Sequence, residues 1–343
     1  MRTRVILLVA VWLAACGPAT PVDDLFYVRS NGALMPVWLR GNPSSGTVVL
    51  FLAGGPGPGL FYEEEPVFRR LEQKYVVAFW DQRAAGGVQG TAAPETLTLA
   101  QYVADADAVI QAIEQRQKPA RIALLGWSWG GLIGQAYLAE PARQAHIAGW
   151  INTDGLHHRA RSDALSREWA MSEARQRVEA ADEVDHWRAA LDWYGAHPSL
   201  GCQDWAQHGA YLTELSPARH PERLRTLGSW GFNLFGPFAG LATLSNYGYT
   251  TEQALTPGSP LCAAVNTDLT ASLPRITVPS LVVWGRHDQG VPLASGEEAY
   301  ALLGAPAERK SLVVLDDADH SALVQQPDAF DDVVEPFLDG LSP

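Results

Sequence analysis

The fold is decided by the stretch RIALLGWSWGGLIGQAYL, residues 121–138. Its apolar run 121–125 predicts a buried strand, and the segment 132–139 predicts a helix. Between them lies Gly126-Trp127-Ser128-Trp129-Gly130, a G-x-S-x-G pattern at a strand–turn–helix junction. A serine on so sharp a turn presents its hydroxyl to solvent, and the glycines let strand and helix approach closely. We therefore predict that Ser128 is a nucleophile.

Further short apolar runs lie before and after this stretch. Two of them flank Asn31-Gly32, which predicts a hairpin near the start of the chain. The others resemble parallel strands buried on both faces, and they occupy residues 47–52, 75–79, 146–151, 280–284 and 311–315. Segment 99–115 repeats its apolar residues with a period of about 3.6, which predicts a helix. Strands that alternate with helices predict an α/β fold with a mostly parallel sheet flanked by helices.

This alternation is interrupted between residues 156 and 275. The interrupting segment is charged and helix-like over 162–196 and then becomes rich in Gly, Pro and aromatic residues. It contains five of the twelve tryptophans, which are Trp169, Trp187, Trp193, Trp205 and Trp230. A long insertion between two strands of a regular sheet predicts a mainly helical cap, placed before the last two strands. We expect 25–155 and 276–343 to form the core, and 156–275 to form the cap.

The segments after the last two predicted strands contain the partners that a nucleophilic serine requires. Asp288 follows the run 280–284, and His320 follows the run 311–315. The carboxyl ends of parallel strands meet at one edge of the sheet, where catalytic groups of open α/β sheets collect. We predict that His320 removes the proton of Ser128 and that Asp288 orients and stabilises the imidazole.

Two neighbouring side chains are alternatives for these roles. Asp154 follows the run 146–151, so it is a second candidate for the acid. His287 adjoins Asp288 and is a candidate for the base, but it lies on the loop of the acid itself. The chain order Ser, Asp, His favours His320 as the base.

Other acids and histidines near these strands fit structural roles. Asp316, Asp317 and Asp319 are interpreted as solvated loop acids or caps. His157 and His158 are adjacent, but the sequence has no HExxH motif and no clustered third ligand. We predict no metal site.

The first buried run ends in a glycine-rich loop, Ala53-Gly54-Gly55-Pro56-Gly57-Pro58-Gly59. A dinucleotide-binding loop is a poor interpretation, because two prolines remove amide donors and no helix follows at once. The loop is better suited to supply a backbone donor to the oxygen that becomes negative during acyl transfer. We assign the two donors of this oxyanion hole to the N–H groups of Gly55 and Trp129.

Three motifs make the chain resemble the α/β-hydrolase fold serine hydrolases, and in particular the prolyl iminopeptidase-like group. They are GGPG at 54–57, Asp81-Gln82-Arg83 after the next strand, and GWSWGG at 126–131. The resemblance implies the α/β-hydrolase fold and hydrolysis through an acyl-enzyme, without a metal or an organic cofactor. Asp81 and Arg83 are interpreted as structural partners at the strand end.

The same resemblance implies an aminopeptidase that acts on short peptides or amino-acid amides. In iminopeptidases, cap carboxylates bind the free α-amine of the substrate. The cap here offers five glutamates, none in a matching pattern: Glu168, Glu173, Glu179, Glu183 and Glu214. A carboxylesterase for small apolar esters would use the same catalytic residues and is the alternative. A non-catalytic binding lipoprotein is the third hypothesis, against which the intact Ser, Asp and His argue.

The N-terminus resembles the signal peptide of a bacterial lipoprotein. Two arginines precede the apolar run 5–15, which is too short to span a bilayer. The sequence LAAC at 13–16 is similar to a lipobox, which implies cleavage before Cys16 and attachment of lipid to it. We expect 1–15 to be a signal peptide and 16–24 a tether. The protein would then be exported and anchored to a membrane, on the periplasmic or cell-envelope face.

The net charge bears on the partners of the protein, and the cysteine count bears on its disulfide bonding. The chain has 343 residues and a net charge of −13, which disfavours nucleic acid as a partner. We expect a small-molecule or short-peptide substrate, and the sequence does not indicate an oligomeric state. If Cys16 carries lipid, Cys202 and Cys262 remain as a pair in an oxidising compartment. We predict a disulfide between them, with two separate buried thiols as the alternative.

Overall fold

The computed structural model describes residues 20–57, 59–90, 92–216 and 241–342. The predicted signal peptide, Cys16, Trp230 and the stretch 217–240 of the cap lie outside these ranges. Among the described residues, none of the helices combines the length and the apolar content that a membrane crossing requires.

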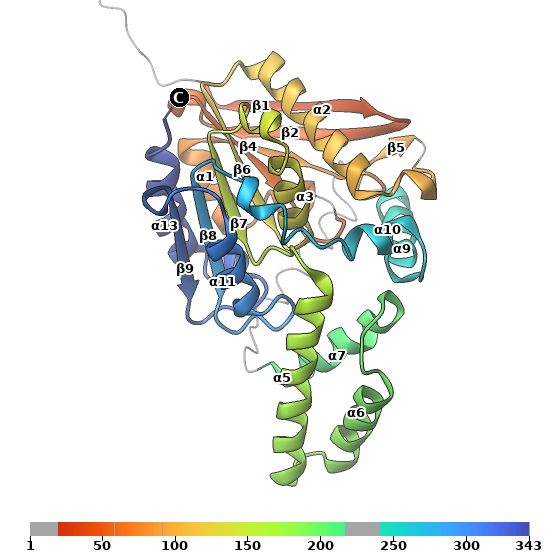
Figure 1. Ribbon diagram of the computed structural model, residues 1–343. Coiled ribbons are helices and arrows are strands. Elements are labelled where there is room, and N and C mark those ends of the chain that lie inside the picture. Colours follow the sequence, from red (N-terminus) through yellow and green to blue (C-terminus); the bar gives the residue numbers. More distant parts are fainter. Residues whose placement is uncertain (1–19, 58, 91, 217–240, 343) are drawn as a thin grey trace, which may run out of the picture.

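The described residues form one sheet of nine strands at the centre of the molecule (Figure 1). The strand order is β1-β2-β4-β3-β6-β7-β8-β9, and β5 pairs with β2. The pairs of β2 are antiparallel, whereas every pair from β4 to β9 is parallel. The strands are β1 (Val22–Ser30), β2 (Ala33–Gly41), β3 (Thr47–Leu52), β4 (Val76–Trp80), β5 (Gln89–Gly90), β6 (Arg121–Trp127), β7 (Gly149–Thr153), β8 (Ser280–Gly285) and β9 (Lys310–Leu315).

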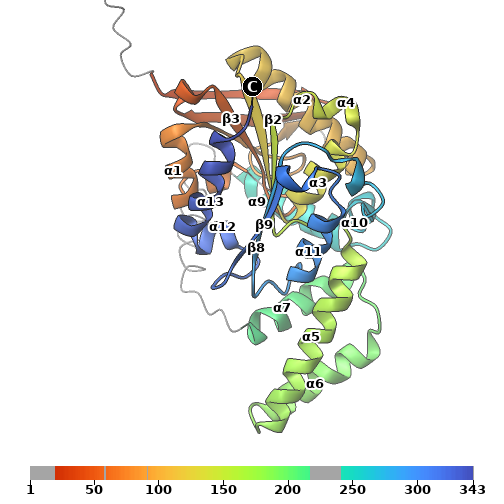
Figure 2. The ribbon, with the colours of Figure 1, turned by 60° about the vertical axis from the view of Figure 1, so that its left-hand side comes forward.

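Helices cover both faces of this sheet, as Figure 2 shows from a second side. Residues of α2, α3 and α11 pack on one face, and residues of α1, α12 and α13 pack on the other. The α-helices are α1 (Pro66–Lys74), α2 (Leu99–Gln117), α3 (Trp129–Leu138), α4 (Pro141–Gln144), α5 (Arg159–Glu179), α6 (Val184–Ala196), α7 (Trp205–Leu215), α9 (Leu241–Leu255), α10 (Pro260–Val265), α11 (Leu293–Leu302), α12 (Ala322–Gln325) and α13 (Pro327–Asp339). The predicted mostly parallel sheet flanked by helices is confirmed.

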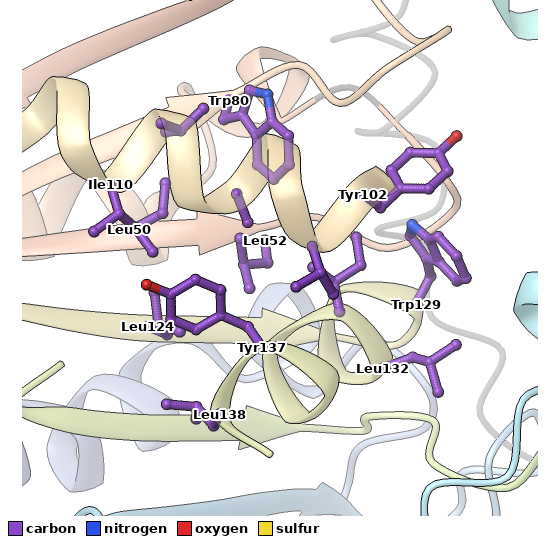
Figure 3. Close-up of a cluster of buried hydrophobic side chains, with 14 of the residues drawn as sticks. Leu50, Leu52, Trp80, Tyr102, Ile110, Leu124, Trp129, Leu132, Tyr137 and Leu138 are labelled. Atoms are coloured by element: carbon purple, nitrogen blue, oxygen red, sulfur yellow. The ribbon is translucent and has the colours of Figure 1, made fainter. Parts of the chain in front are cut away.

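The core follows from the two-residue period of a strand. In β3, Leu50 and Leu52 belong to the apolar cluster under α2 and α3, whereas Val49 and Phe51 belong to the cluster on the opposite face. Figure 3 shows Leu50 and Leu52 packed among side chains of these two helices, such as Tyr137 of α3. Burial on both faces explains why the strand runs are continuously apolar.

The first strand begins earlier than the sequence analysis expected. The predicted tether extends to residue 24, but β1 begins at Val22, so the last three residues of that segment are part of the sheet. Two side chains hold them there. Trp38 Nε1 donates to Asp23 at 2.7 Å, and the Arg116 guanidinium donates to both carboxylate oxygens of Asp24.

The predicted helical insertion lies between β7 and β8 and falls into two parts. Helices α5, α6 and α7 share a small apolar cluster of their own, and α5 and α6 extend away from the sheet (Figures 1 and 2). Trp187 is buried at the centre of this cluster, and Trp169 and Trp193 pack against it. The second part joins the main core, because α10 contributes Leu261 to the cluster of α2 and α3.

The Cys202–Cys262 disulfide joins these two parts of the insertion. Cys202 begins the short helix η4 (Cys202–Asp204) that leads into α7, and Cys262 lies in α10. The two Cα atoms are 6.0 Å apart. The predicted pairing is therefore present in the structure.

Candidate active site

Ser128 occupies the sharp turn between β6 and α3. Its backbone angles, φ 55° and ψ −118°, lie outside the regions that non-glycine residues ordinarily adopt. The glycine at 130 is required by close packing, since a Cβ there would lie 1.8 Å from the carbonyl oxygen of Leu52. The strand, turn and helix predicted around the G-x-S-x-G motif are all present.

Ser128, His320 and Asp288 form one hydrogen-bonded chain at the carboxyl edge of the sheet. They follow β6, β9 and β8 respectively. The Ser128 hydroxyl lies 2.9 Å from His320 Nε2, and His320 Nδ1 lies 2.9 Å from Asp288 Oδ2. With Nδ1–H donating to the carboxylate, Nε2 is free to accept the serine proton.

Backbone and ring contacts hold the two partners of the serine in place. Asp288 is 1% exposed, and its second oxygen, Oδ1, accepts from the amides of Gly290 and Val291 at 2.8 Å. The indole N–H of Trp127 donates to the carbonyl oxygen of His320 at 2.7 Å. Each side chain is therefore fixed before a substrate arrives.

The electrostatics of this chain are set by burial and by two carboxyl groups. Burial alone would lower the pKa of His320, but Asp288 and, to a smaller degree, Asp154 raise it to about 9. Burial also raises the pKa of Asp288, against the opposing effect of His320. A histidine must be neutral to accept a proton, so the reactivity of Ser128 is expected to increase as the pH rises through the pKa of His320.

Asp154, the alternative acid, lies behind this chain. It is fully buried after β7, and its carboxylate accepts from the backbone amides of Gly285, at 2.8 Å, and Ala322, at 3.2 Å. The Nδ1–H of the His320 ring donates to Asp288. The structure thus gives the two acids different partners.

The glycine-rich loop lies directly against Ser128. A Cβ on Gly54 would stand 3.2 Å from Ser128 Cβ, and Gly55 has φ +133°, a conformation that favours glycine. Gly55 and Trp129 both line the cavity that contains the Ser128 side chain. The two residues whose N–H groups we predict to form an oxyanion hole therefore line the same cavity as Ser128.

Gln82 connects this loop to the serine turn, a role that the sequence analysis missed. Its Nε2 donates to the carbonyl oxygen of Ala53, and its Oε1 accepts from the indole N–H of Trp129, both at 2.8 Å. Gln82 is fully buried. The sequence signal for this role was the position of Gln82 between Asp81 and Arg83 in the DQR motif.

A family model for the alpha/beta hydrolase fold matches residues 47–327, which include the serine, the acid and the histidine. The chain belongs to the alpha/beta hydrolase fold family. The family model thus agrees with the α/β fold that the strands and helices show.

Individual relatives of this alpha/beta hydrolase carry different activities in their names. It is 23% identical over 299 residues to the "Probable aminopeptidase YbaC" of Bacillus subtilis, which covers 82% of this chain and 86% of the relative. A solved proline iminopeptidase of Mycobacterium smegmatis superposes with a TM-score of 0.61 and 20% identity, covering 92% of this chain and 97% of its own. A solved esterase from Exiguobacterium antarcticum superposes with a TM-score of 0.58 and 19% identity, covering 91% of this chain and 98% of its own. The structural likenesses show the shared fold.

Asp81 and Arg83 of this alpha/beta hydrolase make structural contacts, in line with their predicted roles. Asp81 accepts from the amides of Leu60 and Gly87, and burial raises its pKa to about 6. Arg83 pairs with buried Asp105 through two hydrogen bonds of 2.7 and 2.8 Å.

The remaining predicted histidines and acids lie apart from the serine chain. His157 is buried beside Glu298, and His158 lies 3.7 Å from Asp268. In the described ranges, no three His, Cys, Asp or Glu side chains are grouped as metal ligands.

The acids that follow β9 differ from one another in burial. Asp316 is exposed and pairs with Arg286. Of the two roles predicted for Asp319, solvated loop acid or cap, the first is wrong, because Asp319 is 6% exposed. Its carboxylate accepts from the backbone N–H of Ser321, just before α12, and from Gln325 Nε2. Its burial follows from the tight turn that carries His320.

A cavity of about 90 Å³ opens beside Ser128. Its lining includes His320, apolar residues such as Leu156 and Val291, and Arg159 at the start of α5. None of the five cap glutamates singled out in the sequence belongs to this lining. A larger cavity, of about 920 Å³, lies at the opposite edge of the sheet beside Arg121 and away from the serine chain.

Helix α5 is fastened to the loop that carries Asp288. Ser166 of α5 donates to the carbonyl oxygen of Gln289 at 2.5 Å, and His208 Nε2 of α7 lies 2.8 Å from the same hydroxyl. Burial lowers the pKa of His208 to about 4, so this histidine is neutral at neutral pH. Because the one hydroxyl proton of Ser166 goes to Gln289, the Nε2–H of His208 donates to Ser166, and Nδ1 accepts from the Tyr194 hydroxyl at 2.9 Å. These contacts hold α5 and α7 in a fixed position relative to the loop that carries Asp288.

Proposed function

We propose that this chain is a serine hydrolase that works through an acyl-enzyme. The observation that carries the proposal is the hydrogen-bonded chain Ser128–His320–Asp288, with 2.9 Å at each step. A free serine hydroxyl is a weak nucleophile, and an adjacent base oriented by a third group is the arrangement that activates it.

In this mechanism Ser128 Oγ attacks the carbonyl carbon of the substrate while His320 Nε2 takes the hydroxyl proton. The carbonyl oxygen becomes an oxyanion, which accepts hydrogen bonds from the N–H groups of Gly55 and Trp129. The imidazolium, stabilised by Asp288, then gives its proton to the leaving group, and an ester to Ser128 remains. Water attacks that ester with His320 again as the base, and the acid is released.

The first substrate class that we propose is a short peptide or an amino-acid amide, cleaved as an aminopeptidase would cleave it. Support comes from the GGPG, DQR and GWSWGG motifs, and from the similarity to a probable aminopeptidase over most of both chains. The solved proline iminopeptidase shares the fold.

A carboxylesterase is the second candidate, and the lining of the cavity favours it. Among the described residues that border the cavity there is no carboxylate for a substrate α-amine, and Leu156, Val265 and Val291 give it apolar walls. Small apolar acyl groups suit such walls. The chemistry at Ser128 is the same in both candidates.

Paired substrates separate the two candidates. We expect purified protein to hydrolyse aminoacyl-naphthylamides and p-nitrophenyl esters of short acids, and Ser128→Ala to lower both rates by a factor on the order of 10⁴. Turnover of esters alone, with no amide cleavage, would reject the aminopeptidase and retain the esterase. A Ser128→Ala variant as active as the wild type would reject both.

A further inference from the structure

We propose that Arg159 binds a carboxylate of the substrate, a few bonds away from the carbonyl that Ser128 attacks. This inference rests on the proposed function, because it places the ligand in the cavity beside the serine. It adds a substrate class, namely esters or amides that carry a negative charge.

The position of Arg159 is the first observation. It is the first residue of α5, it is 8% exposed, and it lines the same small cavity as Ser128, Gly55 and Trp129. Among the described residues of that lining, it is the one side chain with a permanent positive charge. A substrate that occupies this cavity would therefore be bordered by both Ser128 and Arg159.

The hydrogen bonds of Arg159 are the second observation. Its Nε donates to both carboxylate oxygens of Asp163 at 2.7 Å. The terminal nitrogens, Nη1 and Nη2, make no hydrogen bond to another described residue. A guanidinium has five N–H donors, and Nη1 and Nη2 carry four of them. Within the described part of the chain, these four donors are therefore open to a ligand.

The ring of Trp205 supplies the third observation. Arg159 Cζ lies 4.8 Å from the centroid of that ring, which also lines the cavity and is 46% exposed. A flat ring beside the guanidinium restricts its orientation, and Asp163 restricts it from the other end. A planar donor group held in this way suits the two oxygens of a carboxylate.

A purely structural ion pair would not need this arrangement. Arg159 and Asp163 are four residues apart on α5, and such a pair is satisfied on the helix surface. Here the pair is buried beside the nucleophile, in a cavity whose described lining contains no carboxylate. The placement therefore points to a ligand that pairs with the N–H donors of Arg159 that Asp163 does not engage.

Two kinds of substrate place a carboxylate at this distance. In a dipeptide, the free C-terminal carboxylate belongs to the leaving group. In a half-ester of a dicarboxylic acid, it belongs to the acyl group. Both present the same chemistry to Arg159, and two matched substrate pairs distinguish them.

The experiment measures kcat/KM for each charged substrate and for its neutral isostere. The first pair is alanyl-alanine and alanyl-alanine amide, and the second is monomethyl glutarate and the methyl ester of glutaric acid monoamide. We expect the wild type to favour the charged member of one pair by about tenfold or more, the usual effect of a charge-assisted hydrogen bond. A preference in the dipeptide pair means that Arg159 binds a carboxylate of the leaving group. A preference in the glutarate pair means that it binds a carboxylate of the acyl group.

Variants of α5 test whether Arg159 is the cause. Arg159→Gln should bring the preference close to one, and Arg159→Gln combined with Asp163→Asn should do the same without leaving a buried carboxylate unpaired. Arg161→Gln is the matched control, because Arg161 is exposed on the same helix and pairs with Glu298. Each preference is a ratio within one protein, so a lower folded fraction does not change it.

Two results would overturn the inference and leave the proposed function intact. One is a wild-type preference near one in both pairs while neutral substrates are hydrolysed. The other is a preference that survives in both Arg159 variants. If neither pair is hydrolysed and a fluorophosphonate does not label Ser128, the proposed function fails, and the inference fails with it.

Discussion

Asp154 Oδ1 accepts a hydrogen bond of 2.8 Å from the backbone N–H of Gly285. Gly285 ends β8, three residues before Asp288, and the other oxygen of Asp154 accepts from Ala322, two residues after His320. One buried carboxylate therefore fastens the two loops that carry the acid and the base. We propose Asp154 as a positioning residue. Burial raises its own pKa well above the usual range, and in its charged form it raises the pKa of His320.

The pH dependence of hydrolysis tests the influence of this charge. Asp154 raises the pKa of His320, so Asp154→Asn should lower it. Because His320 must be neutral to act as the base, the acidic limb of kcat/KM should move to lower pH. Asp316→Asn, at an exposed acid of the histidine loop, should leave the limb in place. An unchanged limb in Asp154→Asn would rule out this electrostatic role.

Gln82 should affect turnover without touching the substrate. Gln82→Ala removes the bridge between Ala53 and the Trp129 indole, and with it the alignment of the two oxyanion donors. We expect kcat to fall by about ten- to a hundredfold at nearly constant KM, after correction for active sites by titration. Gln111→Ala, at an exposed glutamine that bonds only to Asp107 in the described part of the chain, is the control. An unchanged kcat would mean that the loop holds its shape without Gln82.

The Cys202–Cys262 bridge should be detectable in solution and should stabilise the cap. Alkylation of the denatured protein should add two groups only after reduction, as read by intact mass. Replacing both cysteines with serine should lower the free energy of unfolding by about 2–4 kcal/mol, because the bridge closes a long loop. Two thiols that react without reductant would contradict the bridge.

We propose that Cys16 carries the lipid anchor expected from the sequence LAAC at 13–16. In a bacterial host, the wild type should fractionate with membranes and incorporate labelled palmitate. Cys16→Ser should lose the label and leave the membrane fraction. A variant that keeps both properties would show that another segment holds the protein at the membrane.

Much of the fold was predictable because the parallel strands are buried on both faces. The runs 47–52 and 280–284 match β3 and β8 to within one residue. The run 146–151 starts too early, since β7 begins at Gly149. Residues 146 and 147 follow α4, and their amides donate to the carbonyl oxygens of Arg143 and Gln144. Ile147 is buried there although it is not part of the strand, which is why the apolar run appeared to begin earlier.

The strand pattern predicted which residues lie at the carboxyl edge of the sheet, but not which of their side chains contact one another. Asp154 and Asp288 both follow neighbouring parallel strands, so the sequence places each at the right edge of the sheet. Choosing between them requires the direction of each side chain. Arg159 and Asp163 have a spacing that indicates a helical ion pair, but not that the pair faces a cavity. Such contacts arise from packing between distant segments, which no local pattern contains.

We propose above that Ser128 forms a covalent acyl-enzyme with His320 as its base. The most direct measurement is peptide mass mapping of protein treated with a fluorophosphonate, which reacts with an activated serine. We predict one phosphonyl group per chain, on Ser128, with little or none in His320→Ala or in heat-denatured wild type. Folded wild type that remains unlabelled, or that carries the group on another residue, would contradict the account.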